Sequence, residues 1–154
     1  MSFEESIKQE LENKFPFFKD AAVIKRPRRI FADVPQERFF DVFNYLVRDM
    51  QFAHLCTITG MDEGDTFGVI YHLSRDGVVV FSLRIHISHD NPKIKSVTGY
   101  FLEADAYERE LEDLLGIKVE GLASGQRYPL PDNWPKDDHP LRKDWKLKSE
   151  VDNA

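Results

Sequence analysis

Four histidines in the middle of the chain have the residue type that could bind a metal ion. His72 and His86 lie in stretches that alternate between apolar and polar residues, so they could share one face of neighbouring strands, with His54 and His89 nearby. Neutral imidazole is a common metal ligand. The sequence lacks the usual spacings of a metal site, such as HxxxH on a helix, HxH or a pair of cysteines. We therefore expect no metal site, and a small metal-dependent enzyme that uses these histidines is the alternative.

Acidic residues cluster between positions 108 and 113, where they could suggest acid–base catalysis. Glu108, Glu110, Glu112 and Asp113 fall on a predicted helix, and we expect them to spread over its solvated face. Cys56 is the one cysteine of the chain, and its alternating apolar surroundings favour a buried, inert thiol. The sequence contains no glycine-rich phosphate loop, nucleophile elbow or dinucleotide fingerprint. We therefore predict no catalytic residue, no cofactor and no small-molecule ligand.

The charge of the chain argues against a nucleic-acid partner. The net charge is −6, whereas phosphates attract basic surfaces. Residues 25–29 are a local exception, because they place four cations around Pro27. We expect a solvated or salt-bridged loop there, and a nucleic-acid or phospholipid contact is the alternative. No apolar run approaches the roughly 20 residues that span a bilayer, so we expect a soluble, intracellular chain.

The elements that must position these residues follow from hydrophobic spacing. Apolar residues at intervals of four predict a short helix between residues 2 and 15, and two short extended pieces flank the basic loop. A stronger amphipathic stripe predicts a second helix at about 33–50. Alternation predicts strands at 52–59, 66–74 and 78–88, and a short strand or extended connection at 94–102. We predict an α+β fold, with a mostly antiparallel sheet and two to three helices packed on one face.

A third helix is predicted to start at about Ala104. Asp105 is a plausible N-cap, with Glu108 at the capping-box distance, and Gly116 is positioned to end the helix. Arg109 lies four residues from Asp105 and four from Asp113, so it can pair with either on the helix surface. The predicted buried stripe consists of Tyr107, Leu111, Leu114 and Leu115.

The composition changes after Gly121, which divides the chain into a domain at 1–120 and an extended tail at 121–154. The tail contains both tryptophans, Trp134 and Trp145, and four of the eight prolines. A segment of this kind favours an extended or polyproline path. Two alternatives remain open from the residues alone. The tail folds back and covers its own domain or is disordered, or it wraps a partner through its aromatic residues and arginines.

Several motifs in the second half of the chain occur together. They are Tyr107-Glu108-Arg109-Glu110-x-x-Asp113-Leu114-Leu115-Gly116-Ile117, Leu130-Pro131-Asp132-x-Trp134-Pro135 and His139-Pro140-Leu141-Arg142-Lys143-Asp144. In this order they resemble the 30 kDa subunit family of respiratory complex I, also called the C-subunit family. This family includes related subunits of membrane-bound, energy-converting nickel–iron hydrogenases. The resemblance covers roughly residues 52–145.

The resemblance implies an α+β domain without a redox centre, in the peripheral arm of a multisubunit oxidoreductase. It implies a non-catalytic structural and assembly subunit that docks on a large catalytic subunit, beside an iron–sulfur subunit, and supports electron transfer. Contact with the membrane would come only through that complex, on the cytoplasmic side. The implied partner-binding residues are Arg109, Glu110, Arg127, Trp134, His139, Pro140, Leu141, Arg142, Lys143, Asp144 and Trp145.

The chain departs from the family pattern at the start of the tail. After the glycine that corresponds to Gly121, the family usually has His-Pro and, further on, a pair of arginines. Here those positions read Leu122-Ala123 and Gln126-Arg127, so one arginine remains. The Leu130-Pro131-Asp132-x-Trp134-Pro135 run favours the hydrogenase branch of the family.

Overall fold

A computed structural model describes residues 1–147, and residues 148–154 of the predicted tail lie outside the described part. A five-stranded sheet in the order β1-β2-β5-β4-β3 forms the centre, and β6 and β7 form a separate two-stranded sheet. The elements are α1 (Phe3–Lys14), the 3-10 turn η1 (Pro16–Phe18), β1 (Ala22–Arg26), β2 (Arg29–Asp33), the 3-10 turn η2 (Gln36–Arg38), α2 (Phe39–Arg48), β3 (His54–Asp62), β4 (Thr66–Arg75), β5 (Val79–Ser88), β6 (Lys93–Lys95), α3 (Ala104–Leu115) and β7 (Lys118–Glu120).

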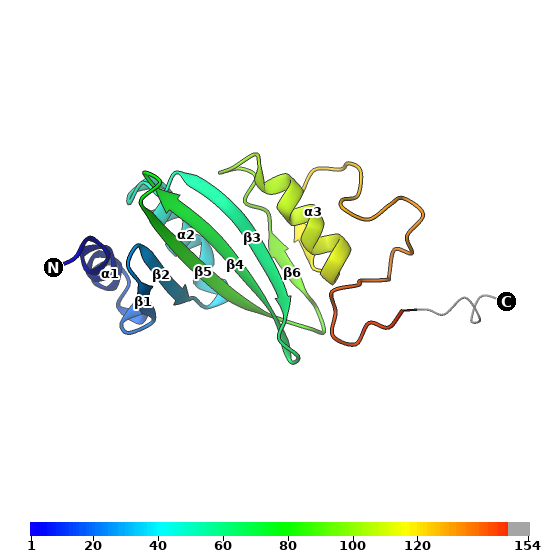
Figure 1. Cartoon of the computed structure of the whole chain (residues 1–154), viewed down its shortest axis with the longest axis horizontal. Helices are drawn as coiled ribbons and strands as arrows, with labels where there is room; N and C mark the ends of the chain where they lie inside the picture. Colours follow the sequence, from blue (N-terminus) through cyan, green and yellow to red (C-terminus); the bar gives the residue numbers. More distant parts are fainter. Residues whose placement is uncertain (148–154) are drawn as a thin grey trace.

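The first helix and the basic loop lie together at one end of the molecule (Figure 1). The predicted capping box starts α1, since the Glu5 N–H donates to Ser2 Oγ at 3.1 Å and the Ser2 N–H donates to Glu5 Oε2 at 2.6 Å. Residues 25–28 are exposed at the turn between β1 and β2. The Arg28 N–H donates to Glu4 Oε1 at 2.5 Å, so α1 holds this turn. The basic residues therefore lie in a largely solvated hairpin turn.

The sheet is mostly antiparallel, as predicted, with one exception. Strands β3, β4 and β5 form an antiparallel meander, and β1 pairs antiparallel with β2. Strand β2 pairs parallel with β5, from Arg29 opposite Val80 to Asp33 opposite Arg84. This pairing arises because α2 carries the chain from β2 to the far edge of the sheet, and the meander then returns to β2. The alternation of apolar and polar residues along one strand does not indicate which distant strand pairs with it.

The core lies between one face of the sheet and the helices. Phe43 of α2 is fully buried and packs edge-on against Tyr71 of β4 at 5.7 Å between ring centroids. Helix α3 packs on β3, where a Cβ added to Gly60 would lie 2.6 Å from a methyl carbon of Leu115. Figure 1 shows α2 behind the sheet and α3 beside β3. On the other face, polar residues such as Arg84 and His86 of β5 reach solvent, which confirms the prediction of one wet face.

Two details at the third helix differ from the predictions. Glu103 occupies the N-cap position without a side-chain hydrogen bond, because Asp105 instead pairs with Arg109 at 2.8 Å. The predicted strand at 94–102 is shorter, since only Lys93–Lys95 is extended, and it pairs parallel with β7, which sequence analysis missed. The predicted end at Gly116 is confirmed, with φ of 71°. Within residues 1–147, no helix has the length and hydropathy needed to cross a membrane.

Candidate partner-binding surface

The C-terminal segment, defined here as residues 121–147, folds back along α3. It contains no helix or strand, and none of its residues is buried. Figure 1 shows this segment on the side of α3 that faces away from the sheet. Of the two alternatives left open by the sequence, the described residues therefore follow the one in which the tail lies on its own domain. Its tryptophans do not enter the core.

Three residues of the segment bind the carboxyl end of α3. His139 Nδ1 donates to the Asp113 carbonyl at 2.9 Å, the Leu141 N–H donates to the Leu114 carbonyl at 3.0 Å, and Arg142 Nε donates to the Leu115 carbonyl at 2.7 Å. The last carbonyls of a helix have no partner within the helix. A cation there also interacts favourably with the helix dipole. The motif at 139–142 is thus the C-terminal cap of the helix that carries the motif at 107–116.

Gly116 is required at this junction for two reasons. Its φ of 71° is a left-handed conformation that residues with a Cβ rarely adopt. A Cβ at this position would also lie 2.6 Å from the His139 ring and 2.7 Å from an Arg142 guanidinium nitrogen. The glycine therefore ends the helix and lets the two capping side chains approach the backbone.

The Asp113 carboxylate binds the first half of the segment. It accepts from Arg127 Nη2 at 3.0 Å and from the Leu130 N–H at 3.0 Å. Arg127 also donates from Nη1 to the Trp134 carbonyl at 2.6 Å, so it joins two turns of the segment. Asp113 is 7% exposed, and the expectation that it belongs to a solvated acidic face is wrong. A buried carboxylate is stable here because a guanidinium and an N–H neutralise and bind it.

Glu108 is likewise not part of a solvated face. It is fully buried, and it accepts from Ser96 Oγ and from the Val97 N–H, both at 2.7 Å. Burial raises the pKa of Glu108 above its usual value, although the two hydrogen bonds oppose this effect. Both carboxylate oxygens are occupied, so Glu108 fixes the loop after β6 to α3. The acid–base cluster that spacing suggested is a set of structural contacts.

The end of the segment also reaches the sheet. The Lys143 N–H donates to Asp62 Oδ2 at 2.9 Å, at the end of β3. Burial alone would raise the pKa of Asp62, but hydrogen bonds from the N–H groups of Lys143 and Gly64 and from His89 lower it to about 2. Asp62 is thus a stable anion that positions the last described turn of the segment.

The residues predicted to bind a partner fall into two groups in the structure. Some bond inward to the domain: Arg109 pairs with Asp105 and donates to the Ala123 carbonyl at 2.7 Å. Trp134 and Trp145 donate their indole N–H groups to Asp138, inside the segment. Others face outward, led by Leu141, which is 55% exposed. The inward group is Arg109, Arg127, Trp134, His139, Arg142 and Trp145. Contact with a partner stays a prediction for Glu110, Pro140, Leu141, Lys143 and Asp144.

Leu141 forms part of a groove between β3 and α3. The groove has a volume of about 300 Å³ and is shared by the edge strand of the sheet, the helix and the C-terminal segment. Glu110 lies on its helical side. Sequence analysis did not find this groove, because the groove forms only when the C-terminal segment folds back over α3. The groove is lined by Thr57, Ile58, Thr59, Gly60, Glu110, Leu111, Leu114, Leu115 and Leu141.

The strand histidines do not converge. His72 lies between Thr59 Oγ1 and Ser82 Oγ, and burial lowers its pKa. His86 contacts Glu63 and Asp33, and His89 stacks on Phe67 and contacts Asp62. His54 is exposed at the start of β3. Among residues 1–147, no group of three or more histidine, cysteine or acidic side chains is arranged to hold a metal ion. The metal-dependent alternative has no geometric support in this part of the chain.

Comparison with known proteins identifies the family of the chain. The model of the family described as respiratory-chain NADH dehydrogenase, 30 kDa subunit, matches residues 32–151. The chain belongs to this family. The match spans α2, the sheet strands β3 to β5, α3 and the C-terminal segment. The resemblance carried by the motifs at 107–117, 130–135 and 139–144 is therefore confirmed.

Individual relatives cover nearly the whole chain. The C-subunit of the F420H2 dehydrogenase of Methanosarcina mazei is 36% identical over 143 residues, which cover 91% of this chain and 90% of that protein. The C-subunit of the NADH-quinone oxidoreductase of Moorella thermoacetica is 29% identical and covers 92% and 95%. A chain from the membrane-bound sulfane sulfur reductase, an archaeal respiratory membrane complex, has the same fold, with a TM-score of 0.83, 23% identity and coverage of 99% and 91%.

Proposed function

We propose that this chain is a non-catalytic structural subunit of a membrane-associated, multisubunit oxidoreductase of the hydrogenase or NADH:quinone oxidoreductase type. Its relatives are named as subunits of dehydrogenases and oxidoreductases, which supports a place in such a complex. In this role the chain holds the large catalytic subunit and a neighbouring iron–sulfur subunit in a fixed relation on the cytoplasmic side. The chain then supports electron transfer only by fixing the positions of these two subunits.

The observation that carries the proposal is the division of the C-terminal segment into inward and outward residues. Arg127, His139 and Arg142 bind α3, so the segment has a defined shape before it meets a partner. A preorganised surface costs less conformational entropy on binding than a disordered one. Leu141 and Tyr128 are 55% and 51% exposed, and they present apolar surface from this folded-back segment. Large apolar side chains surrounded by polar groups are typical of protein–protein interfaces.

The groove beside Leu141 supplies the proposed contact with the large subunit. It borders β3, which is an edge strand of the five-stranded sheet. An apolar side chain of the partner would fill the groove, while Glu110, Lys143 and Asp144 would form a polar rim. On this basis residues 1–120 act as the scaffold and the segment after residue 120 acts as the docking element.

Replacing the exposed leucine tests the proposal. Leu141→Asp should leave the isolated chain folded, because the side chain is outside the core, but should place a charge in the interface. Leu102→Asp is the matched control, since Leu102 is 85% exposed and lies before α3, away from the groove. Each tagged variant is purified under gentle conditions from the native host, and the recovered subunits are identified by mass spectrometry and metal analysis.

We expect the wild-type chain and Leu102→Asp to recover a large subunit and an iron–sulfur subunit. Leu141→Asp should recover at least tenfold less of both, which corresponds to a loss of about 1.4 kcal/mol of binding free energy. Recovery of the wild-type chain as a monomer, without any such partner, would contradict the proposed function. Equal recovery with Leu141→Asp would show that the groove is not the docking surface.

A further inference from the structure

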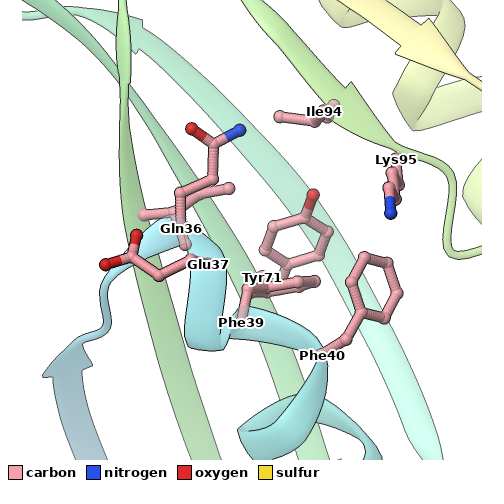
Figure 2. Close-up of a pocket in the computed structure, with 8 residues that line it drawn as sticks. Gln36, Glu37, Phe39, Phe40, Tyr71, Ile94 and Lys95 are labelled. Carbon is pink, nitrogen blue, oxygen red and sulfur yellow. The ribbon is translucent and has the colours of Figure 1, made fainter.

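A basic surface lies at the end of the molecule that carries α1, opposite α3 and the C-terminal segment (Figure 1). It consists of Phe3, Lys25, Arg26, Arg28, Arg29, Arg75 and Val78. The cavity between η2, α2 and β6, with a volume of about 410 Å³, differs from it, because Glu37 and Lys95 in its lining have opposite charges (Figure 2). The basic surface instead concentrates positive charge in a chain whose net charge is −6.

Three segments that are distant in the sequence build this surface. The Arg28 N–H donates to Glu4 Oε1 at 2.5 Å, which joins the β1–β2 turn to α1. The Arg28 carbonyl accepts from the Val80 N–H at 3.0 Å, which places the turn beside the start of β5. The Arg75 guanidinium lies 5.2 Å from the centre of the Phe3 ring, so the β4–β5 turn also reaches α1. The fold therefore gathers the cations of two turns around one end of α1.

The cations of the β1–β2 turn are not neutralised by ion pairs. Within residues 1–147, no ion pair within 4 Å involves Lys25, Arg26, Arg28 or Arg29. Glu4 is buried, and it accepts from the backbone of the turn. Cations held this close repel one another, so their arrangement is more stable when an anion binds there.

The backbone of Arg28 supports a role for its side chain. Pro27 and Arg28 form the two-residue turn between the paired residues Arg26 and Arg29, and Arg28 has φ of 65°. Glycine or asparagine is the usual residue at such a position, because most side chains are unfavourable at a left-handed φ. An exposed arginine at a strained position indicates that its cation is used.

Exposed apolar side chains beside the cations distinguish the possible anions. Phe3 and Val78 are 45% and 44% exposed. A nucleic acid binds a basic surface mainly through its phosphates, which offer no contact for these side chains. An anionic membrane would extend beyond the surface and meet Glu5 and Asp76, which are exposed next to it in the chain and would repel it.

A narrow acidic segment of a protein has neither disadvantage. Its carboxylates would accept paired hydrogen bonds from guanidinium groups, and arginine is enriched in protein–protein interfaces whereas lysine is depleted. We propose that the basic surface binds an acidic segment of another protein, which also carries an apolar side chain that packs on Phe3 and Val78. The family model begins its match at residue 32, so most of this surface precedes that match. The proposal is independent of the proposed structural role and of the groove beside Leu141.

A set of matched peptides tests the proposal on the full chain. The first is a synthetic peptide of glutamates interrupted by leucines, titrated at about 150 mM salt, where distant charges are screened. NMR should show shifts of the amide signals of Arg28, Arg29 and Val78, while the signal of Leu141 stays unchanged. A peptide with glutamine in place of glutamate should not bind. A peptide with serine in place of leucine should bind about threefold more weakly, because it lacks the apolar contact.

The Arg28→Asn variant separates binding from folding. Its affinity for the acidic peptide should fall about fivefold, because one cation is lost. Its melting temperature should stay the same or rise, because asparagine tolerates a left-handed φ better than arginine does. Lys118→Gln is the control, since it removes the same charge from an exposed position on β7. It should leave the affinity unchanged.

A photo-crosslink in the native host identifies the natural partner. Benzoylphenylalanine in place of Val78 should crosslink to a protein segment with a surplus of aspartate and glutamate, and Arg28→Asn should reduce the yield. The same crosslinker in place of Leu102, which is 85% exposed before α3, should not capture that segment.

Four results would overturn the proposal. They are an acidic peptide that leaves the amides of Arg28 and Val78 unshifted, an equal affinity in Arg28→Asn, and a crosslink from position 78 only to lipid, nucleic acid or a segment without surplus acid. The fourth is tighter binding at the same amides to phosphatidylglycerol vesicles or to a DNA duplex than to the acidic peptide.

Discussion

Helix α3 packs on the sheet through apolar side chains, whereas the C-terminal segment is bonded to the same helix through backbone carbonyls and one buried carboxylate. On the sheet side, Leu111 and Leu115 are almost completely buried against β3. On the other side, Asp113 and the last turn of the helix bind the segment through polar groups that lie between 14 and 27 residues further along the chain. Two surfaces of one helix thus use different forces.

This difference distinguishes contacts that break only when the whole domain unfolds from contacts that can break locally. Burial of apolar side chains is the main favourable term in folding, and it is lost when the sheet and helices separate together. The segment buries no residue, and its hydrogen bonds lie near solvent. Such regions open locally at a lower free energy than the core. We therefore expect the segment to detach from α3 without unfolding of the domain.

The largest effect is expected on the sheet side. Leu111→Ala removes a buried side chain that packs directly on Gly60 of β3, and a large-to-small change of this kind costs about 2–5 kcal/mol of unfolding free energy. Urea denaturation measures this cost. Leu102→Ala, at an 85% exposed site, should change the free energy by less than about 0.5 kcal/mol. Similar values for the two variants would mean that α3 is not packed on the sheet as described.

The next effect is expected on the opposite side of the same helix. Asp113→Ala leaves Arg127 and the Leu130 N–H without their acceptor. The expected loss of stability is about 1–3 kcal/mol, because the two donors are left unpaired. Hydrogen exchange should show faster exchange at Leu130 and Leu141, while amides in β4 and β5 keep their protection. Glu103→Ala, an exposed carboxylate before α3, is the control. An equal loss of protection in the sheet would show that the segment and the core unfold as one unit.

The junction between helix and segment should respond to a single methyl group. Gly116→Ala places a Cβ at a left-handed φ, which costs about 1–2 kcal/mol, and forces His139 and Arg142 away from the helix end. Gly99→Ala is the matched control, because a Cβ there meets nothing within 4 Å. Urea denaturation and exchange at Leu141 should distinguish the two. If Gly116→Ala behaves like Gly99→Ala, the cap described here does not form.

The last effect appears only at acid pH, at the far end of the segment. The pKa of Asp62 is about 2 in the folded chain and 3.8 ordinarily, so the unfolded state binds more protons between these values. The contribution of Asp62 to stability is therefore complete above about pH 4 and is lost as the pH falls toward 2. The Lys143 amide signal should report this titration by NMR, and Asp62→Asn should abolish it. A midpoint near 4 would contradict the hydrogen bonds assigned to Asp62.

Local spacing was enough to predict most of the elements. The capping box at Ser2 and Glu5 begins α1, the stripe through Phe43 identifies α2, and alternation identifies β4 and β5. These features depend on residues within one or two turns of each other, so periodicity reports them directly. The motifs around α3 and at 139–144 were also sufficient for the family.

The sequence by itself determined most of the elements and the wet and buried faces of the sheet, because each depends on neighbouring residues, and its motifs identified the family. Tertiary structure decided which residues meet across long distances in the chain. The parallel pairing of β2 with β5, the burial of Glu108 and Asp113, and the cap of α3 by His139 and Arg142 join segments that no local period relates. An acidic residue on a helix is solvated by default, and here a loop and a distant arginine supply the partners that make its burial stable.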